Sequence, residues 1–175
     1  TIMTTEPKFV PNEAVELTLK DSAKFKVRLV DCVGYLVEGA IGHEEDGKPR
    51  MVTTPWYEKA IPFEEAAEIG TRKVITDHST IGLVVTTDGS ITDIERNNYV
   101  PAEERVVREL KELNKPFIIV LNTTRPSSVE TANLKEELES KYEVPVVAAD
   151  CANMKIEDVH EILENHSFDS LLIGT

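Results

Sequence analysis

Several kinds of residue are scarce in this chain, and each shortage excludes a class of protein. Only 2 of the 175 residues are cysteine, which excludes a disulfide framework and favours a reducing compartment. The longest clean apolar run, residues 117–121, is far shorter than the roughly twenty residues of a membrane helix. No basic stretch followed by an apolar one marks a signal peptide. The chain does not begin with methionine, and we expect it to be a piece of a longer protein.

Positive charge is also in short supply. The chain has 19 lysine and arginine residues against 32 aspartate and glutamate residues, a formal net charge of −13. Such a surface repels phosphate backbones and anionic lipid, so nucleic acid is not an expected partner. A hydrophobic content of 41% is typical of a folded chain, and this length suits one domain. We therefore expect one domain over residues 1–175.

Two kinds of apolar pattern predict β-strands. Residues 15–19 and 25–30 alternate apolar and polar side chains on either side of a turn at 20–24, which predicts a hairpin. Continuous apolar runs at 81–87 and 117–121 predict strands that are buried on both faces. A further short strand is predicted at residues 144–149.

Helical spacing of apolar residues separates these strands. It predicts helices at 63–78, from Pro101 onward, at 131–142 and at 156–165. Residues 33–56 show no period and are rich in glycine and proline, so we expect a long loop there. Strands that alternate with helices indicate βαβ units and a parallel sheet, so the predicted fold class is α/β.

An acidic motif follows the second strand of the hairpin. Asp31-Cys32-Val33-Gly34 has the layout with which P-loop nucleotidases support Mg²⁺ and bring a glycine N–H to a γ-phosphate. D-x-x-G is also a common loop sequence, and an ordinary acidic turn is the alternative. Thr4 and Thr5 precede the hairpin, where a threonine hydroxyl would complete the magnesium shell and sense the γ-phosphate. Ordinary solvated threonines are the alternative there.

A second motif follows the strand at 117–121. GTPases carry Asn-Lys-x-Asp at this place, and the aspartate accepts hydrogen bonds from guanine, whereas this chain has Asn122-Thr123-Thr124-Arg125. Arginine cannot accept a hydrogen bond, so we expect another base, with adenine the natural candidate. Tyr35 follows Gly34 in place of the water-orienting glutamine of Ras-like proteins. Another group must therefore position an attacking water.

Five blocks of the sequence are long and unusual, namely residues 1–12, 28–35, 54–58, 65–75 and 78–82. These blocks closely resemble the stage IV sporulation protein A family. The resemblance covers roughly residues 1–160 and implies a cytoplasmic ATPase of endospore-forming bacteria. The implied fold is a Ras-like P-loop NTPase, a three-layer α/β fold with a mostly parallel sheet, and the implied cofactors are ATP and Mg²⁺. For the nucleotide site, the resemblance implies that Thr4 and Thr5 are sensor threonines and that Asp31 is the Walker B aspartate in the magnesium shell. It also implies that Gly34 and Asn122 contact the nucleotide.

The same resemblance implies a role in building the spore coat. Members of the family polymerise on the mother-cell side of the forespore membrane, so the implied partners are further copies of the chain, coat proteins and a small membrane-anchor peptide. No G-x-x-x-x-G-K-[ST] occurs in the 175 residues, so the family's P-loop is expected before residue 1. The resemblance also implies middle and C-terminal domains, which we expect to lie outside these residues, and we expect residues 164–175 not to continue the family pattern. The alternative function is a structural, self-associating coat module with an incomplete nucleotide site.

The expected absence of the P-loop strand leaves a gap between the hairpin and the strand at 81–87. Strands beside such a gap have unpaired N–H and C=O groups, so we expect the apolar tail at 171–174 or a strand of a second copy to fill it. A fraying tail is the alternative.

Other polar candidates are interpreted as structural. These are His43–Asp46 as a solvated loop rather than a metal cluster, Cys32 as a small buried residue, and Glu103, Glu104, Glu136, Glu137 and Glu139 as solvated helix surface.

Overall fold

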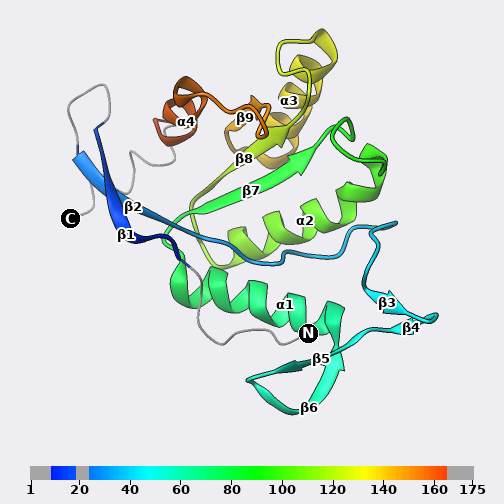
Figure 1. The fold of residues 1–175 in the computed structure, drawn as a ribbon. Helices are drawn as coiled ribbons and strands as arrows, with labels where there is room; N and C mark the ends of the chain where they lie inside the picture. The colour runs from blue at the N-terminus through cyan, green and yellow to red at the C-terminus, as the bar shows by residue number, and fades with distance from the viewer. Residues whose placement is uncertain (1–8, 19–23, 165–175) are drawn as a thin grey trace. The chain divides into compact units, whose positions relative to one another are not determined.

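The computed structural model describes residues 9–18 and 24–164, which fall into two compact units, Thr1–Ser79 and Thr80–Thr175 (Figure 1). Thr4, Thr5 and the predicted tail strand at 171–174 lie outside the described residues.

The described residues of the first unit form three antiparallel pairs of strands and one α-helix that continues into a π-helical turn. The predicted hairpin is confirmed, with Val15 opposite Val27, although its first strand begins earlier than expected. The helix predicted over residues 63–78 is also confirmed, and its last turn is π-helical. The elements in chain order are β1 (Phe9–Thr18), β2 (Lys24–Val30), β3 (Glu44–Glu45), β4 (Lys48–Pro49), β5 (Met51–Thr54), β6 (Tyr57–Pro62), α1 (Phe63–Lys73) and η1 (Val74–His78).

The expectation of a long loop over residues 33–56 is wrong in its second half. The small hairpin β3–β4 lies there, as does β5, the first strand of the hairpin β5–β6. β5 does alternate, because Val52 and Thr54 are buried while Met51 and Thr53 are exposed. Strands of two to four residues carry too little alternation to be recognised among glycines and prolines.

Helix α1 has a buried side that includes one polar residue. Its buried positions Ala67 and Thr71, continued by Ile75 in η1, recur every fourth residue along one side of the helix. Thr71 is the only member of this row with a hydroxyl. The buried side of α1 therefore carries one polar group, the Thr71 hydroxyl, between the apolar side chains of Ala67 and Ile75.

The second unit is a parallel sheet in the order β7-β8-β9, with a helix after each strand. This arrangement confirms the predicted α/β class. The elements are β7 (Gly82–Thr87), α2 (Arg96–Glu112), β8 (Phe117–Asn122), α3 (Val129–Tyr142), β9 (Val146–Ala149) and α4 (Ile156–Leu163). None of the helices in the described ranges is long and apolar enough to cross a bilayer.

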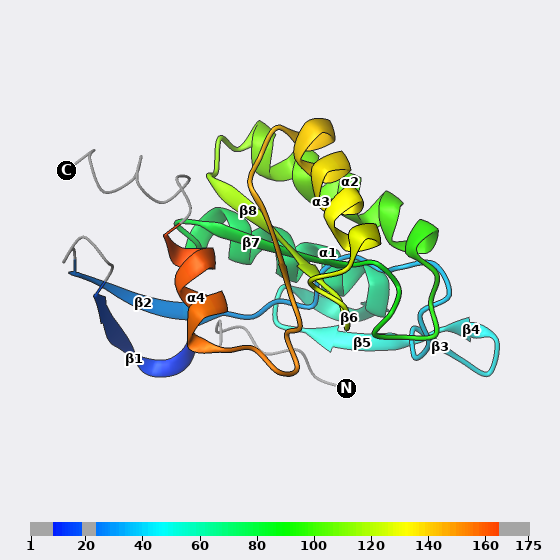
Figure 2. The same ribbon diagram turned by 90° about the horizontal axis from the view of Figure 1, so that it is seen from above.

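The helices of the second unit cover both faces of its sheet (Figure 2). On one face Ile162 of α4 packs against a cluster that includes Ile118 and Val147. On the opposite face a Cβ added to Gly82 would stand 3.3 Å from Leu110 of α2. The second unit therefore has three layers, with α4 on one side and α2 and α3 on the other.

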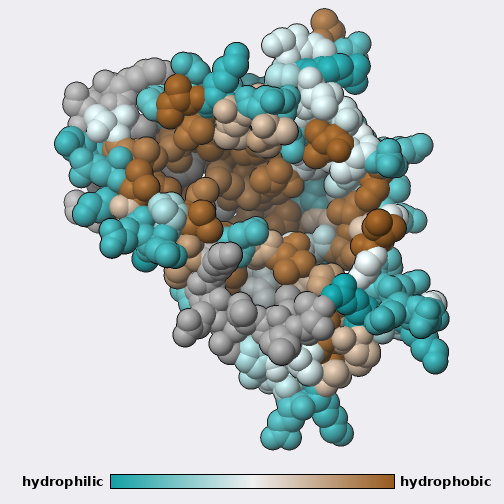
Figure 3. All heavy atoms as spheres, in the orientation of Figure 1, coloured by the Kyte–Doolittle hydropathy of each residue, from teal (hydrophilic) through white to brown (hydrophobic). Residues whose placement is uncertain are grey.

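Strand β7 is less buried than predicted. β8 is buried from Phe117 to Leu121, as expected, whereas Leu83 and Val85 of β7 are 40% and 63% exposed. The register places both on the same face as Ile118 and Val120, and apolar surface is visible over β7 in Figure 3. Within the described part of the chain β7 pairs with β8 alone. The prediction of burial on both faces is wrong for this strand, because no described element covers that half of its side chains.

Two helices begin earlier than predicted. α2 starts at Arg96, and Pro101 lies inside it rather than at its first position. α3 starts at Val129 because the side chain of Ser128 accepts a hydrogen bond from the N–H of Thr131 at 3.1 Å. Such a cap satisfies one of the free N–H groups in the first turn.

Candidate functional site

The loop after β2, residues 31–35, is called the Gly34 loop below. β2 ends at Val30, so Asp31 leaves the strand directly, and it is exposed. Gly34 has φ of +79°, in the left-handed region where only glycine is comfortable. Nothing lies within 4 Å of the position that a Cβ would take. The backbone conformation thus requires a glycine, and the main chain can be closely approached at this point.

Thr71 of α1 holds the Gly34 loop. Its hydroxyl accepts a hydrogen bond from the N–H of Gly34 at 2.9 Å and donates one to the carbonyl of the same residue at 3.3 Å. The side chain that makes these bonds belongs to a residue that is only 2% exposed. Sequence reasoning missed Thr71, although its place in the row with Ala67 and Ile75 was a usable signal.

Cys32 lies in the same loop. It was expected to be buried, but the residue as a whole is exposed. Desolvation of its thiol raises the pKa, and hydrogen bonds involving Thr71 and the main chain of Gly34 only partly oppose that shift. The thiol is therefore protonated at neutral pH, which gives it little nucleophilic character.

The loop after β8, residues 122–128, is called the Thr123 loop. Thr123 is fully buried, and its hydroxyl donates to a carboxylate oxygen of Asp88 at 2.7 Å. The same oxygen of Thr123 accepts the N–H of Arg125 at 3.1 Å. Asn122 accepts the N–H of Cys151 at 3.0 Å, which joins this loop to the one after β9. The carboxyl ends of all three strands are thus linked.

Further bonds fix the same loop. The Ser90 hydroxyl accepts the N–H of Thr124 at 3.0 Å, and the Thr131 hydroxyl donates to the carbonyl of Arg125 at 2.9 Å. Burial alone would raise the pKa of Asp88, but hydrogen bonds from Ser90 and Thr123 outweigh it and lower that pKa. The carboxylate is therefore charged at neutral pH, while Arg125 is exposed on a fixed main chain.

A buried carboxylate joins β7, α2 and α3. Glu103 accepts hydrogen bonds from Thr86 at 2.6 Å, Tyr142 at 2.8 Å and Arg96 at 2.8 Å, and its side chain is 1% exposed. Arg96 reaches both carboxylate oxygens, a bidentate pairing that fixes geometry as well as charge. The expectation that Glu103 is solvated is wrong, because its side of α2 faces these partners.

The neighbouring acidic residues behave as expected. Glu104 is exposed and pairs with Lys141 at 2.7 Å, and Glu136 and Glu137 are exposed. Glu139 departs partly from that expectation, since it is half-buried and accepts the N–H of Val146 at 3.2 Å.

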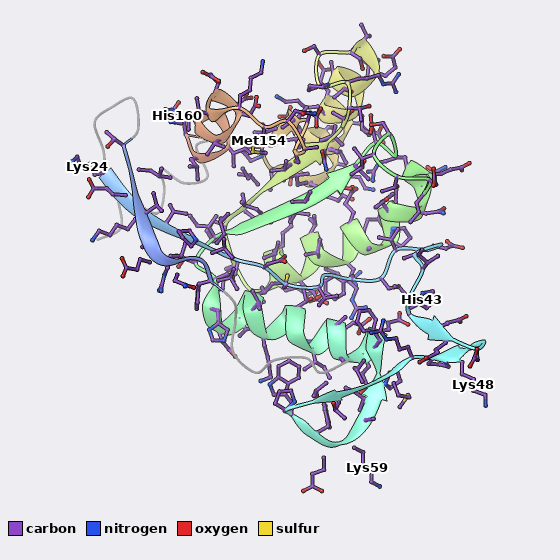
Figure 4. The ribbon with its side chains drawn as sticks, in the orientation of Figure 1. Lys24, His43, Lys48, Lys59, Met154 and His160 are labelled. Carbon is purple, nitrogen blue, oxygen red and sulfur yellow. The ribbon has the colours of Figure 1, made fainter. Side chains whose placement is uncertain are left out.

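The described residues contain no cluster of three histidine, cysteine, aspartate or glutamate side chains that could hold a metal ion. His43 lies where the chain enters β3, with Lys48 near the tip of that hairpin (Figure 4). Its Nδ1 is buried without a partner, and its Nε2 is 4.0 Å from Glu44. Magnesium is usually held through one or two carboxylates, waters and phosphate oxygens. The exposed carboxylate of Asp31 fits that donor set.

The architecture of the second unit is consistent with a nucleotide-binding domain. Its sheet is parallel, its faces are covered by helices, and polar loops meet at the carboxyl ends of the strands, where ligands of such sheets bind. The family model for the ATPase domain of stage IV sporulation protein A matches residues 1–170. The chain belongs to the stage IV sporulation protein A family, and it corresponds to the ATPase domain of that family.

Curated relatives agree with this assignment. The chain is 60% identical over 169 residues to stage IV sporulation protein A of Clostridioides difficile (strain 630). It is 55% identical over the same length to the protein of that name from Bacillus subtilis (strain 168), and 54% identical to the one from Bacillus anthracis. Each alignment covers 97% of this chain and 34% of the relative. The chain thus spans about a third of the length of these relatives.

The match reaches further than the sequence blocks suggested. The resemblance was expected to end near residue 160, but the family model continues to residue 170. Part of the segment after Glu164 therefore follows the family pattern as well.

Proposed function

We propose that this chain is the nucleotide-hydrolysing segment of a sporulation ATPase, which uses ATP and Mg²⁺ to drive self-assembly of the basement layer of the spore coat. The observation that carries the proposal is the Gly34 loop. A carboxylate leaves the end of a strand at Asp31, and a left-handed glycine follows three residues later. The loop belongs to a chain whose family is described as an ATPase domain.

The roles of the residues follow from their chemistry. Asp31 would hold a water of the magnesium shell, and the N–H of Gly34 would donate to the γ-phosphate. Thr4 or Thr5 would complete the shell and sense that phosphate. When bound, Mg²⁺ would neutralise negative charge on the phosphate oxygens. Gly34 suits its role because its main chain can be closely approached.

The Thr123 loop would bind the base of the nucleotide. Asn122 uses its side-chain oxygen to hold Cys151, and its amide nitrogen has no hydrogen-bond partner among the described residues, so it can donate to a base. Arg125 also offers only donors, which suits the ring nitrogens of adenine. We therefore propose that ATP is preferred to GTP.

The proposed setting is the mother-cell side of the forespore membrane. Further copies of the chain, coat proteins and a small membrane-anchor peptide would be the partners. A second candidate function is a structural coat module that associates without hydrolysis.

Release of phosphate from Mg-ATP by the full-length protein tests the proposal. Asp31→Asn should lower the rate about a hundredfold or more, because it removes the charge that supports the metal shell. Asp77→Asn is a matched control, because Asp77 is exposed on η1 in the same unit, and it should leave the rate unchanged. The 175-residue chain alone should neither bind nor hydrolyse ATP measurably. Turnover by that chain, or an inert full-length protein, would contradict the proposal.

A further inference from the structure

We infer that Thr71 competes with a nucleotide phosphate for the main-chain N–H of Gly34, and so holds the loop in a state from which the triphosphate must release it. The inference takes its ligand from the proposed function, while the contact itself is seen in the structure. Thr71 touches neither nucleotide nor metal in this scheme. It is a positioning residue that acts through Gly34.

The geometry makes the competition direct. An N–H group has one hydrogen, and the hydrogen of Gly34 points at the Thr71 oxygen over 2.9 Å. A phosphate oxygen that approached the same N–H would need that hydrogen. The N–H at this left-handed glycine therefore donates either to α1 or to the ligand, but not well to both.

The chemistry decides which acceptor can displace Thr71. Releasing Gly34 also breaks the bond from the Thr71 hydroxyl to the Gly34 carbonyl, and it leaves a hydroxyl that is 2% exposed without these partners. Leaving a buried polar group unpaired is unfavourable. Hydrogen bonds to a charged acceptor are about twice as strong as those between neutral groups. A phosphate oxygen is therefore a sufficient competitor, whereas a water molecule is a poor one.

Because Thr71 belongs to α1, the release of Gly34 from Thr71 would change how the Gly34 loop is attached to that helix. Thr71 lies in the buried row with Ala67 and Ile75, so its side chain is fixed to the helix. When Gly34 turns to the phosphate, both hydrogen bonds between Gly34 and the Thr71 side chain of α1 break. The attachment between loop and helix would then differ between the triphosphate and diphosphate states, because only the triphosphate presents the competing oxygen.

The first experiment measures the attachment itself in the full-length protein. Hydrogen exchange would be followed by mass spectrometry in a peptide that contains Gly34, without nucleotide. Thr71→Val keeps the shape but removes the hydroxyl, and it should speed exchange of the Gly34 N–H by about tenfold or more. Thr71→Ser keeps the hydroxyl and should stay within about threefold of the wild type. Thr71→Ala, which also lacks the hydroxyl, serves if valine is not accommodated.

Thr76→Val is the matched control for that measurement. Its hydroxyl bonds the carbonyl of Arg72 at 2.8 Å within the same helical segment, and the residue is exposed. It loses the same atom in the same substitution without touching the loop, so exchange at Gly34 should not change. Unchanged exchange at Gly34 in Thr71→Val would overturn the inference.

The second experiment measures the competition. Affinities of the full-length protein for Mg-ATP and Mg-ADP would be compared by titration calorimetry. Thr71→Val should raise the ratio of ATP to ADP affinity by about two- to tenfold, the equivalent of one net hydrogen bond. Thr71→Ser and Thr76→Val should keep the wild-type ratio.

The outcomes separate this inference from the proposed function. An unchanged or lower ratio in Thr71→Val, with ATP still bound, would overturn the competition and leave the ATPase proposal intact. Failure of the wild-type full-length protein to bind ATP would overturn both. In that case the exchange data would still show whether Thr71 holds the loop. Faster exchange together with a higher ratio would support the competition.

Discussion

The Gly34 loop and the Thr123 loop both follow a strand and both carry a candidate nucleotide contact, yet they are held in different ways. The Gly34 loop is attached to α1 through one residue, Thr71. The Thr123 loop is tied to the loop after β7 at Asp88 and to the loop after β9 at Cys151. The two hydrogen bonds have different donors and different acceptors, so the loss of one leaves the other in place.

The difference indicates how the two loops would serve a nucleotide. A loop with one attachment can be released by one competing interaction, which suits contact with a phosphate group that is lost on hydrolysis. A loop with several independent attachments keeps its shape, which suits recognition of a base that stays bound. Under the proposed function, the Gly34 loop would supply a releasable contact and the Thr123 loop a fixed one.

Removing the buried carboxylate of the second unit should have the largest effect. Glu103→Ala should lower the free energy of unfolding by about 3–5 kcal/mol, because it leaves Arg96 without its buried partner. Urea denaturation measures this change. The exposed neighbour Glu104 pairs with Lys141 across a 2.7 Å contact, so Glu104→Ala should change stability by less than about 1 kcal/mol. Similar losses in both variants would contradict the view that the second unit depends on a buried polar network.

Thr123→Val should have the next largest effect. It removes the hydroxyl that donates to Asp88 and accepts from Arg125, and it leaves a charged carboxylate with one partner fewer. The expected loss of stability is about 1–3 kcal/mol, measured by the same denaturation. Thr124→Val is the control, since Thr124 is exposed and takes part through its main chain. A loss confined to less than about 0.5 kcal/mol in both variants would mean that the loop is not fixed by these bonds.

The base preference of the Thr123 loop can be tested at its fourth position. Restoring the complete GTPase pattern would require Thr123→Lys, but Thr123 is fully buried and cannot take a longer charged side chain in place. Arg125 is exposed, so Arg125→Asp alone is the sharper change. It should shift the preference of the full-length protein from ATP toward GTP by about tenfold, the value of one good polar base contact. Competition binding measures the shift, and a wild-type preference for GTP would contradict the interpretation of the loop.

Thr71→Val should reduce stability less than Thr123→Val does. Both lose a buried hydroxyl, but the partners of Thr71 are the neutral main-chain groups of a half-buried glycine. A loss of about 0.5–1.5 kcal/mol is expected in urea denaturation. A loss larger than that of Thr123→Val would reverse the comparison between the two loops, because the Gly34 loop would then be the firmly held one.

The smallest expected effect is a change in titration. Burial, followed by the hydrogen bond to Glu103, raises the pKa of Tyr142 to about 12. Because that pKa is raised above its ordinary value near 10, the stability linked to Tyr142 is fully present below pH 10 and is lost between pH 10 and 12. Glu103→Gln should lower the pKa of Tyr142, which NMR of ring-labelled tyrosine would detect. An unchanged pKa would show that burial alone sets it.

The positions of most strands and helices could be predicted from the sequence. Runs such as Phe117–Leu121 and helical spacing are local patterns, and the structure confirms strands and helices at those places. The burial of individual polar residues could not be predicted. Glu103 and Glu104 are adjacent and chemically identical, and only the position of Arg96 and Tyr142 makes one of them a buried partner.

The candidate site divides in the same way. Asp31, Gly34 and Asn122 were found because they stand at fixed places after strands. Thr71 and the role of Thr123 depend on contacts with residues that are 37 and 35 positions away in the sequence. No local pattern carries that information, although a threonine at every-fourth-residue spacing with Ala67 and Ile75 does mark Thr71 as turned inward.

The half-covered strand β7 has a consequence for anyone who purifies this segment. One edge of β7 pairs with no strand among the described residues, and Leu83 and Val85 beside it are exposed. Such an edge can form hydrogen bonds with another chain. We therefore expect copies of the isolated segment to join through this edge of β7. Light scattering or sedimentation of the isolated segment would therefore not distinguish copies joined through β7 from copies joined through a coat-forming contact.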